Sequence, residues 1–315
     1  MTSRERVIAA LTGKKPDKVP FFDNLNRPAR CMVMGREDFT DLEFAKEMNF
    51  DALDYYGFTP PFAAESKNGA IVGRGIASRD DLAKLRLPEL NDEYLAGGRE
   101  FVDRLGNSGL ALFFRTRFGP SFVIQSMGLE NFSYALYDDI SLIDEFAGIF
   151  AEWAGRLLEK VMGMGFDFAW FADDIAYKTQ LMFSPEIFRA IFLPKMKETI
   201  RCWKKPWAYH SDGNLYDVLD DLVALGMNGL NPIEPEAMDI RAIRKKYGSG
   251  LCLIGNVDVS LLCTGTVVQV REEVKRLIDD LGRDGGYVIA TSNSITKYCK
   301  RENALAMRDA IAEYR

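Results

Sequence analysis

The sequence predicts an α/β fold, a (β/α)8 TIM barrel, on three observations. Short apolar or aromatic runs that end in polar residues recur eight times along the 315 residues. Segments with the periodicity of amphipathic helices separate these runs, and strands that alternate with helices indicate a parallel sheet. Eight such units in about 300 residues match the length of a closed barrel. We therefore expect one barrel domain over residues 1–315.

Each predicted strand is a short apolar or aromatic run that polar residues close. The eight runs are 19–26, 50–58, 110–119, 166–174, 206–213, 227–235, 251–258 and 287–295. Among the helices between them, 140–165 and 266–282 show clear amphipathic patterns. The segment SRERVIAALTG (3–13) precedes the first strand and is expected to form a helical cap on the barrel bottom. The segment NGAIVGRG (68–75) predicts a small hairpin inserted after the second strand.

Composition excludes several classes of function. The 40 Lys and Arg and 46 Asp and Glu residues are mixed along the chain and leave a formal charge of −6, so no basic stripe for nucleic acid exists. We find no secretory signal and no apolar run of about 18 residues, and we therefore expect a cytoplasmic protein without a membrane partner. The five scattered cysteines form no C-x-x-C pair and are expected to be reduced thiols.

Polar residues at the carboxyl ends of barrel strands meet at one mouth, where such barrels carry their chemistry. Aromatic residues alternate with them, which suits a ring-shaped apolar ligand held by a few polar groups, although a single ring more often packs in the core. The candidate substrate-binding residues are Phe22, Asn24, Tyr55, Phe114, Arg115, Tyr177, Asn256 and Asn293.

His210, in AYHSDGN, is the only histidine of the chain. A lone histidine is often a half-buried ring satisfied by the backbone. This one ends the fifth predicted strand, beside Asp212 and across the mouth from Glu234 and Asp174, which favours metal ligation or acid/base work. Glu234 stands between two prolines that restrict its direction. We predict His210, Glu234 and Asp174 as catalytic residues.

Asp174 follows Asp173, and adjacent strand residues face opposite sides of a sheet. At most one of the two carboxylates is therefore expected in the mouth. The other is expected at the surface or at the start of a helix, as a cap.

Several segments are similar to the uroporphyrinogen decarboxylase superfamily over nearly the whole chain. They are SRERVIAALTGKKPDKVPF, DDIAYKTQLMFSPEIFRAIFLPKMK, HSDGN, NPIEP, LIGNVD and GGYVIATSNSI. The resemblance implies a barrel and one of two activities: porphyrinogen decarboxylation, or zinc-dependent methyl transfer with the cobalt of a corrinoid protein.

Two departures favour the methyltransferase branch. The decarboxylases carry Arg-Gln-Ala-Gly-Arg-Tyr after the first strand, where this chain has FFDNLNRPARCMVMG with scattered Arg27 and Arg30. The methyltransferases hold zinc with His-x-Cys and a later cysteine, where this chain has His210-Ser211-Asp212 and Asn293. A zinc site of His210, Glu234 and Asp212, with Asp174 as a further candidate, would suit an ether oxygen or an amine better than a thiol.

We therefore predict a methyltransferase of the O-demethylase type that moves a methyl group from a small methylated donor, preferably an aryl methyl ether, to a corrinoid protein. No D-x-H-x-x-G cobalamin segment occurs, so the corrinoid is expected on a separate polypeptide. One alternative is a decarboxylase of a smaller acid, with Arg115 or Arg117 binding a carboxylate. A catalytically silent barrel that binds a ligand is the other.

Overall fold

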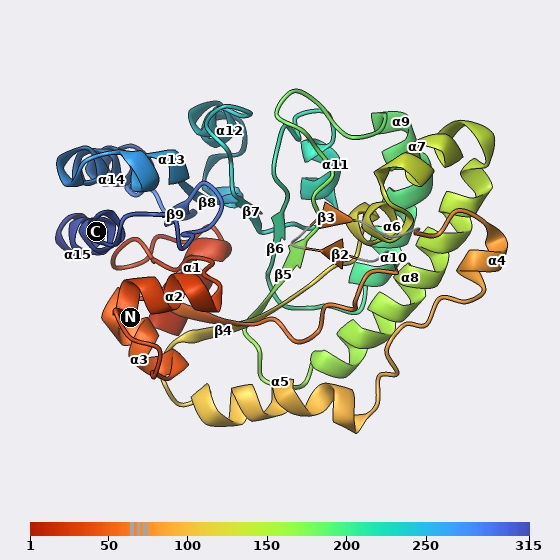
Figure 1. Cartoon of the computed structure of the whole chain (residues 1–315). Coiled ribbons are helices and arrows are strands. Elements are labelled where there is room, and N and C mark those ends of the chain that lie inside the picture. The colour runs from red at the N-terminus through yellow and green to blue at the C-terminus, as the bar shows by residue number, and fades with distance from the viewer. Residues whose placement is uncertain (64–65, 68–69, 72–74) are drawn as a thin grey trace.

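The computed structural model describes residues 1–63, 66–67, 70–71 and 75–315. A parallel sheet of seven strands curls at the centre of the molecule, and helices surround it (Figure 1). The strands follow one another in chain order, as a barrel requires: β1 (Ala52–Tyr55), β4 (Ala111–Thr116), β5 (Phe168–Ala172), β6 (Trp207–His210), β7 (Gly229–Asn231), β8 (Cys252–Val257) and β9 (Tyr287–Thr291). Each lies inside one of the predicted runs, which confirms the fold class.

The first predicted strand is reduced to a single parallel bridge, Phe21 with Ile289 of β9. Its segment still joins both edges of the sheet: Ile289 donates to the carbonyl of Pro20 at 3.0 Å, and Asp51 donates to that of Phe21 at 2.7 Å. Pro20 has no N–H, and the Phe21 N–H bonds to the Asp51 carboxylate at 2.9 Å instead of a strand carbonyl. These contacts close the barrel without a regular eighth strand.

Helices follow the strands and cover the outside of the barrel (Figure 1). They are α1 (Ser3–Leu11), α2 (Arg27–Met34), α3 (Asp41–Met48), α4 (Arg79–Leu82), α5 (Asp92–Leu105), α6 (Pro120–Met127), α7 (Leu129–Asp138), α8 (Ile140–Val161), α9 (Pro185–Ile187), η1 (Phe188–Phe192, a π-helical turn), α10 (Leu193–Ile200), α11 (Leu219–Ala224), α12 (Ile240–Tyr247), η2 (Gly248–Gly250), α13 (Val259–Thr264), α14 (Val267–Leu281) and α15 (Arg301–Tyr314). Within the described residues, no helix has both the length and the apolar composition that crossing a bilayer requires.

Helix α1 covers the amino ends of the strands, as predicted. Its Arg4 side chain pairs with Asp167, just before β5, and the Arg4 N–H donates to Gly109, just before β4. Its start at Thr2 is a capping box with Glu5, in which each side chain bonds the other residue's backbone N–H. The opposite end of the barrel therefore stays available for a site.

A small hairpin follows β1, with β2 (Ser66–Lys67) paired antiparallel with β3 (Ala70–Ile71); only β3 lies inside the predicted segment 68–75, because the hairpin begins two residues earlier. Residues 68–69 and 72–74 of the predicted segment lie outside the described residues.

Strand alternation decides which rings face the barrel interior. Phe113 of β4 stacks on Phe168 of β5, with ring centroids 4.5 Å apart, and both lie beside Phe22. The neighbouring Phe114 points the other way, into the helix layer, where it contacts Trp203. The interior is therefore an aromatic core whose upper layer forms the floor of the mouth.

Candidate active site

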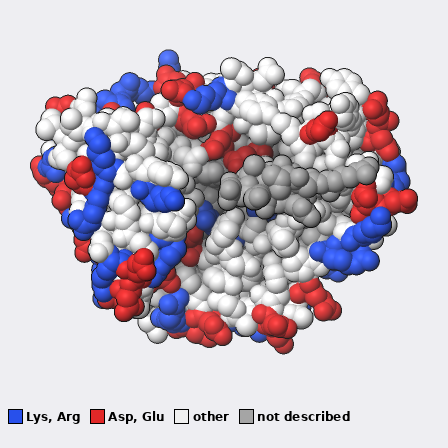
Figure 2. All heavy atoms as spheres, viewed as in Figure 1, with Lys and Arg blue, Asp and Glu red and all other residues white. Residues whose placement is uncertain are grey.

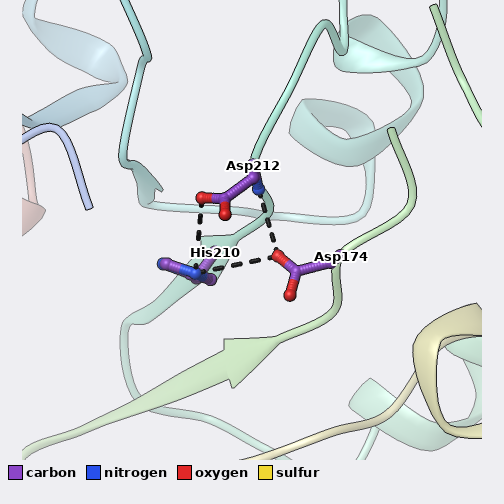
Figure 3. Close-up of side chains that lie close together, drawn as sticks. All are labelled: Asp174, His210 and Asp212. Atoms are coloured by element: carbon purple, nitrogen blue, oxygen red, sulfur yellow. Dashed lines mark hydrogen bonds and ion pairs between the residues drawn. The ribbon is translucent and has the colours of Figure 1, made fainter. Parts of the chain in front are cut away.

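Three side chains converge at the carboxyl ends of β5 and β6. His210 is the last residue of β6, Asp212 follows it by two residues, and Asp174 stands two residues after β5. The Nε2 atom of His210 lies 3.7 Å from Asp174 Oδ1 and 3.9 Å from Asp212 Oδ1. Figure 3 shows both carboxylates turned toward the imidazole ring. We name Asp174, His210 and Asp212 the acidic triad.

Hydrogen bonds fix the tautomer of His210. The Asn231 side chain donates through Nδ2 to the carbonyl of Ile254 at 2.9 Å, so its Oδ1 faces His210 as an acceptor. This Oδ1 lies 2.6 Å from Nδ1 of His210, and Nδ1 must therefore carry the proton. In the neutral ring, Nε2 then presents a lone pair to two carboxylates. Such an arrangement calls for a cation among the three groups, either a proton on Nε2 or a metal ion.

The carboxylates of the acidic triad are held in place. Asn293 donates through Nδ2 to both oxygens of Asp212, at 3.0 and 2.8 Å, and the Asp212 N–H donates to Asp174 Oδ1 at 3.1 Å. Burial raises the pKa of Asp212 to about 6, and the charges of Asp174 and Glu234 act in the same direction while His210 opposes them. Ionised carboxylates this close together are unfavourable, and a proton or another cation bound among them would stabilise the triad.

The donor set fits a metal ion of intermediate or hard character. One imidazole nitrogen and two carboxylate oxygens lie within 4.8 Å of one another, and catalytic zinc sites commonly use three protein ligands of these types. Sulfur is missing, since the residue two positions after His210 is Asp212, which supplies a carboxylate. The set therefore suits oxygen or nitrogen substrates better than thiols.

Glu234 does not belong to the triad. Its Oε2 accepts the N–H of Gly213 at 2.7 Å, which holds the loop after β6. In the structure Asp174 takes the place beside His210 and Asp212 that the predicted zinc set gave to Glu234.

Asp173 turns away from the mouth, as alternation predicted for one member of the pair. It is fully buried and accepts the N–H groups of Phe118, Gly119 and Ser121 at the start of α6. Asp173 therefore caps the N-terminus of α6, the helix that follows β4. It reaches this helix because β4 and β5 are neighbours in the sheet. Burial raises its pKa to about 6.

A small cavity of about 10 Å³, the space of about one water molecule, lies next to the triad. Aromatic and amide groups dominate its walls, with one ion pair at an edge: Phe22, Asp23, Asn24, Asp54, Phe113, Arg115, Trp170, Asn231, Ile254, Ala290 and Asn293. The Trp170 ring lies 6.1 Å from the His210 ring, which places the triad at the side of this cavity. A wider groove adjoins it through Asn24, Asp54, Arg115 and Asn293.

The structure brings four of the eight predicted substrate-binding residues into this cavity: Phe22, Asn24, Arg115 and Asn293. Tyr55 and Phe114 are not among them. Tyr55 packs on Phe58 and Phe101 in the helix layer, and Phe114 packs on Phe166 and Trp203. Both residues were predicted on the interior face of their strands, but their side chains lie on the outer face, toward the helices.

Tyr177 and Asn256 also lie elsewhere. The Tyr177 side chain is exposed on the loop after β5 and lines none of the cavities described for this mouth. The buried Asn256 donates through Nδ2 to the carbonyl of Ile233 at 3.0 Å and borders an outer groove beside α12. Its amide stabilises the loop after β7 and is not available to a ligand at the cavity.

The predicted set omitted Asp54, Phe113, Trp170 and Asn231, all of which line the cavity. A signal for one of them was present in the sequence. Arg115 cannot be buried in the helix layer without a partner, so it favours the interior face of β4. Its neighbour two positions back, Phe113, then shares that face.

Comparisons with known proteins agree with this architecture. Residues 116–314 match the family model described as uroporphyrinogen decarboxylase (URO-D). The uroporphyrinogen decarboxylase of Chlorobaculum tepidum is 24% identical over 268 residues, which cover 78% of this chain and 69% of that protein. That of Methylobacillus flagellatus is 38% identical over 68 residues, only 22% of this chain and 19% of that protein.

Among solved structures, a methyltransferase from Methanosarcina mazei shares the fold with a TM-score of 0.78. It is 19% identical, and the alignment covers 100% of this chain and 99% of that one. A B12-independent methionine synthase from Shewanella reaches a TM-score of 0.51 at 12% identity, over 73% and 69% of the two chains. Because the family model spans more than half of its length, this chain belongs to the uroporphyrinogen decarboxylase (URO-D) family.

Proposed function

We propose that this chain is a methyltransferase that moves a methyl group from an aryl methyl ether to the cobalt of a corrinoid carried by a separate protein. The observation that supports it most is the lone pair of His210 Nε2, turned toward two carboxylates beside an aromatic cavity. This arrangement holds a proton or a metal ion where a leaving oxygen would lie. Full-length similarity in fold to the Methanosarcina methyltransferase supports the same reaction class.

In the proposed reaction the methyl–oxygen bond breaks and its electron pair stays on the oxygen. Co(I) of the carrier supplies the electron pair of the new cobalt–carbon bond, and the phenolate takes up a proton. Phe22, Phe113 and Trp170 would contact an arene bound in the adjoining groove. His210 would place positive charge at the ether oxygen, where negative charge develops. Asn231 keeps the imidazole in the required tautomer.

Asp174, His210 and Asp212 would hold a zinc ion, if zinc is the cation of this site. When bound, zinc would act as a Lewis acid toward the ether oxygen. Without metal, a protonated His210 beside Asp174 and Asp212 would fill the same role as a general acid.

The corrinoid must reach the mouth on another polypeptide. The single histidine of the chain belongs to the acidic triad, and its Nδ1 is already bonded to Asn231. We therefore expect the carrier protein to be a much better methyl acceptor than free cobalamin.

A second candidate function is decarboxylation of a small aromatic acid. Arg115 in the cavity supports it, as does the name of the two relatives. A porphyrinogen itself fits poorly. The adjoining groove contains two other arginines, Arg27 and Arg30. Their side-chain N–H groups already donate to backbone carbonyls and to Asp41 and Asp54, so they are not free to bind the carboxylates of a porphyrinogen.

The direct test incubates the purified chain with a Co(I) corrinoid protein and a panel of methoxyarenes. We expect the absorbance of methyl-cobalt to rise and an equal amount of phenol to form. Absence of transfer from every ether, methylamine and methyl thioether would contradict the proposal. Release of CO₂ from an aromatic acid without corrinoid would establish the second function instead.

A further inference from the structure

We infer that the aromatic substrate carries a carboxylate and that Arg115 binds it. The inference rests on the proposed function for the identity of the reacting group, but the binding of a carboxylate is argued from the cavity alone. It identifies Arg115 as a specificity residue and narrows the substrate to methoxybenzoates or related aromatic acids.

The donors of Arg115 are largely unused. Its side chain is only 14% exposed, and its one charged contact within the described residues joins Nε to Asp54 Oδ2 at 3.1 Å. This contact is an ion pair without a hydrogen bond, so Nε is a buried donor that has no hydrogen-bond partner among the described residues. The two terminal nitrogens make no hydrogen bond to the described part of the chain. A guanidinium with a free edge is the usual partner of a carboxylate, which it binds through two parallel hydrogen bonds.

Surrounding contacts hold this guanidinium in position. Its central carbon lies 4.5 Å from the centre of the Tyr56 ring, a cation–π contact, while Asp54 holds the Nε side. Asp54 is itself held by Arg30, whose Nη2 lies 3.1 Å from Asp54 Oδ1. The position of Arg115 is thus prepared before any ligand binds, which lowers the entropic cost of binding.

The net charge of the adjoining groove favours the binding of one anion. The groove that adjoins the cavity is lined by Arg27, Arg30 and Arg115 and by the carboxylates of Asp41 and Asp54. These five groups sum to one positive charge. Arg27 and Arg30 donate to other groups, and Arg115 is therefore the arginine of this groove that can take the anion.

The side chains between Arg115 and the acidic triad are aromatic, which favours an aromatic ligand. Phe22, Phe113 and Trp170 form one continuous apolar surface, with Phe113 and Trp170 ring centroids 5.6 Å apart. The groove that adjoins these rings through Asn24, Arg115 and Asn293 has a volume of about 510 Å³, within the range for ligand sites, and it has room for a single ring. A ring held here would have its carboxylate at Arg115 and a methoxy group toward His210.

Isothermal titration calorimetry on the full chain tests this inference without any methyl transfer. The probes are 3- and 4-methoxybenzoate, each compared with the corresponding uncharged methoxybenzamide. We expect the acid to bind about 10- to 100-fold more tightly than the amide, since hydrogen bonds to charged groups account for such factors. Arg115→Gln should abolish the preference and Arg115→Lys should restore part of it. Arg99→Gln, an exposed arginine paired with Asp92 on α5, should keep the preference.

Equal affinity for acid and amide, or no binding of either acid, would overturn the inference, and so would an Arg115→Gln protein that keeps the preference. Circular dichroism of each variant confirms folding, and Asp54 retains Arg30 as a partner when Arg115 is replaced. The proposed function fails separately. Tight binding of methoxybenzoate without methyl transfer would contradict the reaction and leave the carboxylate site intact. Methyl transfer that does not distinguish acids from neutral ethers would contradict only the carboxylate site.

Discussion

The two sides of the barrel mouth carry opposite charge. On the side of β5, β6 and β7, the carboxylates of Asp174, Asp212 and Glu234 surround one imidazole, and no Lys or Arg of the described chain forms an ion pair with them. On the side of β1 and β4, three arginines meet two carboxylates. In Figure 2, acidic side chains gather along the upper edge of the central hollow, and basic ones lie lower within it.

The difference lies in which groups remain without a partner. The acidic side has an excess of acceptors, which would suit a proton or a metal ion, while on the basic side Arg115 forms an ion pair only with Asp54 among the described residues. Coulomb forces are strong in such partly buried places, so a ligand with one basic oxygen and one carboxylate would be oriented by both. The largest effects are therefore expected from changes at the acidic side, where the proposed reaction would take place.

Replacement of His210 should have the largest effect. His210→Ala removes the only imidazole and leaves Asp174 and Asp212 without a common cation. We expect methyl transfer to fall by about 10²- to 10⁴-fold, the usual contribution of a positioned acid or Lewis-acid site. Methyl-cobalt formation and metal content are measured together in the wild type and the variant.

Loss of metal together with activity would identify His210 as a ligand, and loss of activity from a metal-free wild type would identify it as an acid. A variant that keeps full activity but melts at a lower temperature would show that the ring serves the core alone.

Asp174→Asn and Glu234→Gln separate the predicted ligand set from the observed one. We expect Asp174→Asn to lower metal affinity and activity by about tenfold or more, since it removes the negative charge of one of the three candidate ligands. Glu234→Gln keeps an oxygen that can accept the Gly213 N–H, and we expect a smaller effect. Metal titration of both variants decides the matter. If Glu234→Gln loses the metal and Asp174→Asn keeps it, the ligand set inferred from the structure is wrong.

Most of the fold was accessible from the sequence, because eight apolar runs with polar ends describe a barrel directly. That residues 174, 210 and 212 lie at one mouth was accessible for the same reason, but the predicted ligand set contained Glu234 in the place of Asp174. The side-chain alternation of β1 was not, since Asp54 and Tyr55 place chemically plausible side chains on both faces, and that of β4 was accessible only through Arg115. The bond from Asn231 to His210 also depends on a register between β6 and β7 that no local pattern reveals.

Asp54→Asn tests the basic side. The variant removes the negative charge that now partly neutralises Arg115 and Arg30. We expect methoxybenzoate to bind about three- to tenfold more tightly, a change of the size of one partly exposed ion pair. Calorimetry is compared with Asp92→Asn, which breaks an exposed pair on α5. Weaker binding in Asp54→Asn would show that Asp54 acts mainly by positioning Arg115.

The smallest effect concerns Asp23, which lines the cavity between the two sides. Burial raises its pKa to about 7, although the N–H of Thr291, that of Asn24 and the Thr291 hydroxyl oppose the shift. An unfolded aspartate titrates near 4, so between about pH 4 and 7 the folded chain binds more protons than the unfolded chain. The contribution of Asp23 to stability is thus complete below about pH 4 and is lost as the pH rises through 7.

Asp23→Asn should remove this dependence, because the amide does not titrate. We expect the free energy of unfolding of the wild type to fall more steeply than that of the variant between pH 5 and 8, by no more than about 1.4 kcal/mol per pH unit. Urea denaturation at several pH values measures both slopes. Asp173 changes in the same direction, with a pKa of about 6, so only the difference between wild type and variant reports on Asp23. Parallel slopes would mean that Asp23 is ionised in the folded protein, and the basic side of the mouth would then carry no net positive charge at neutral pH.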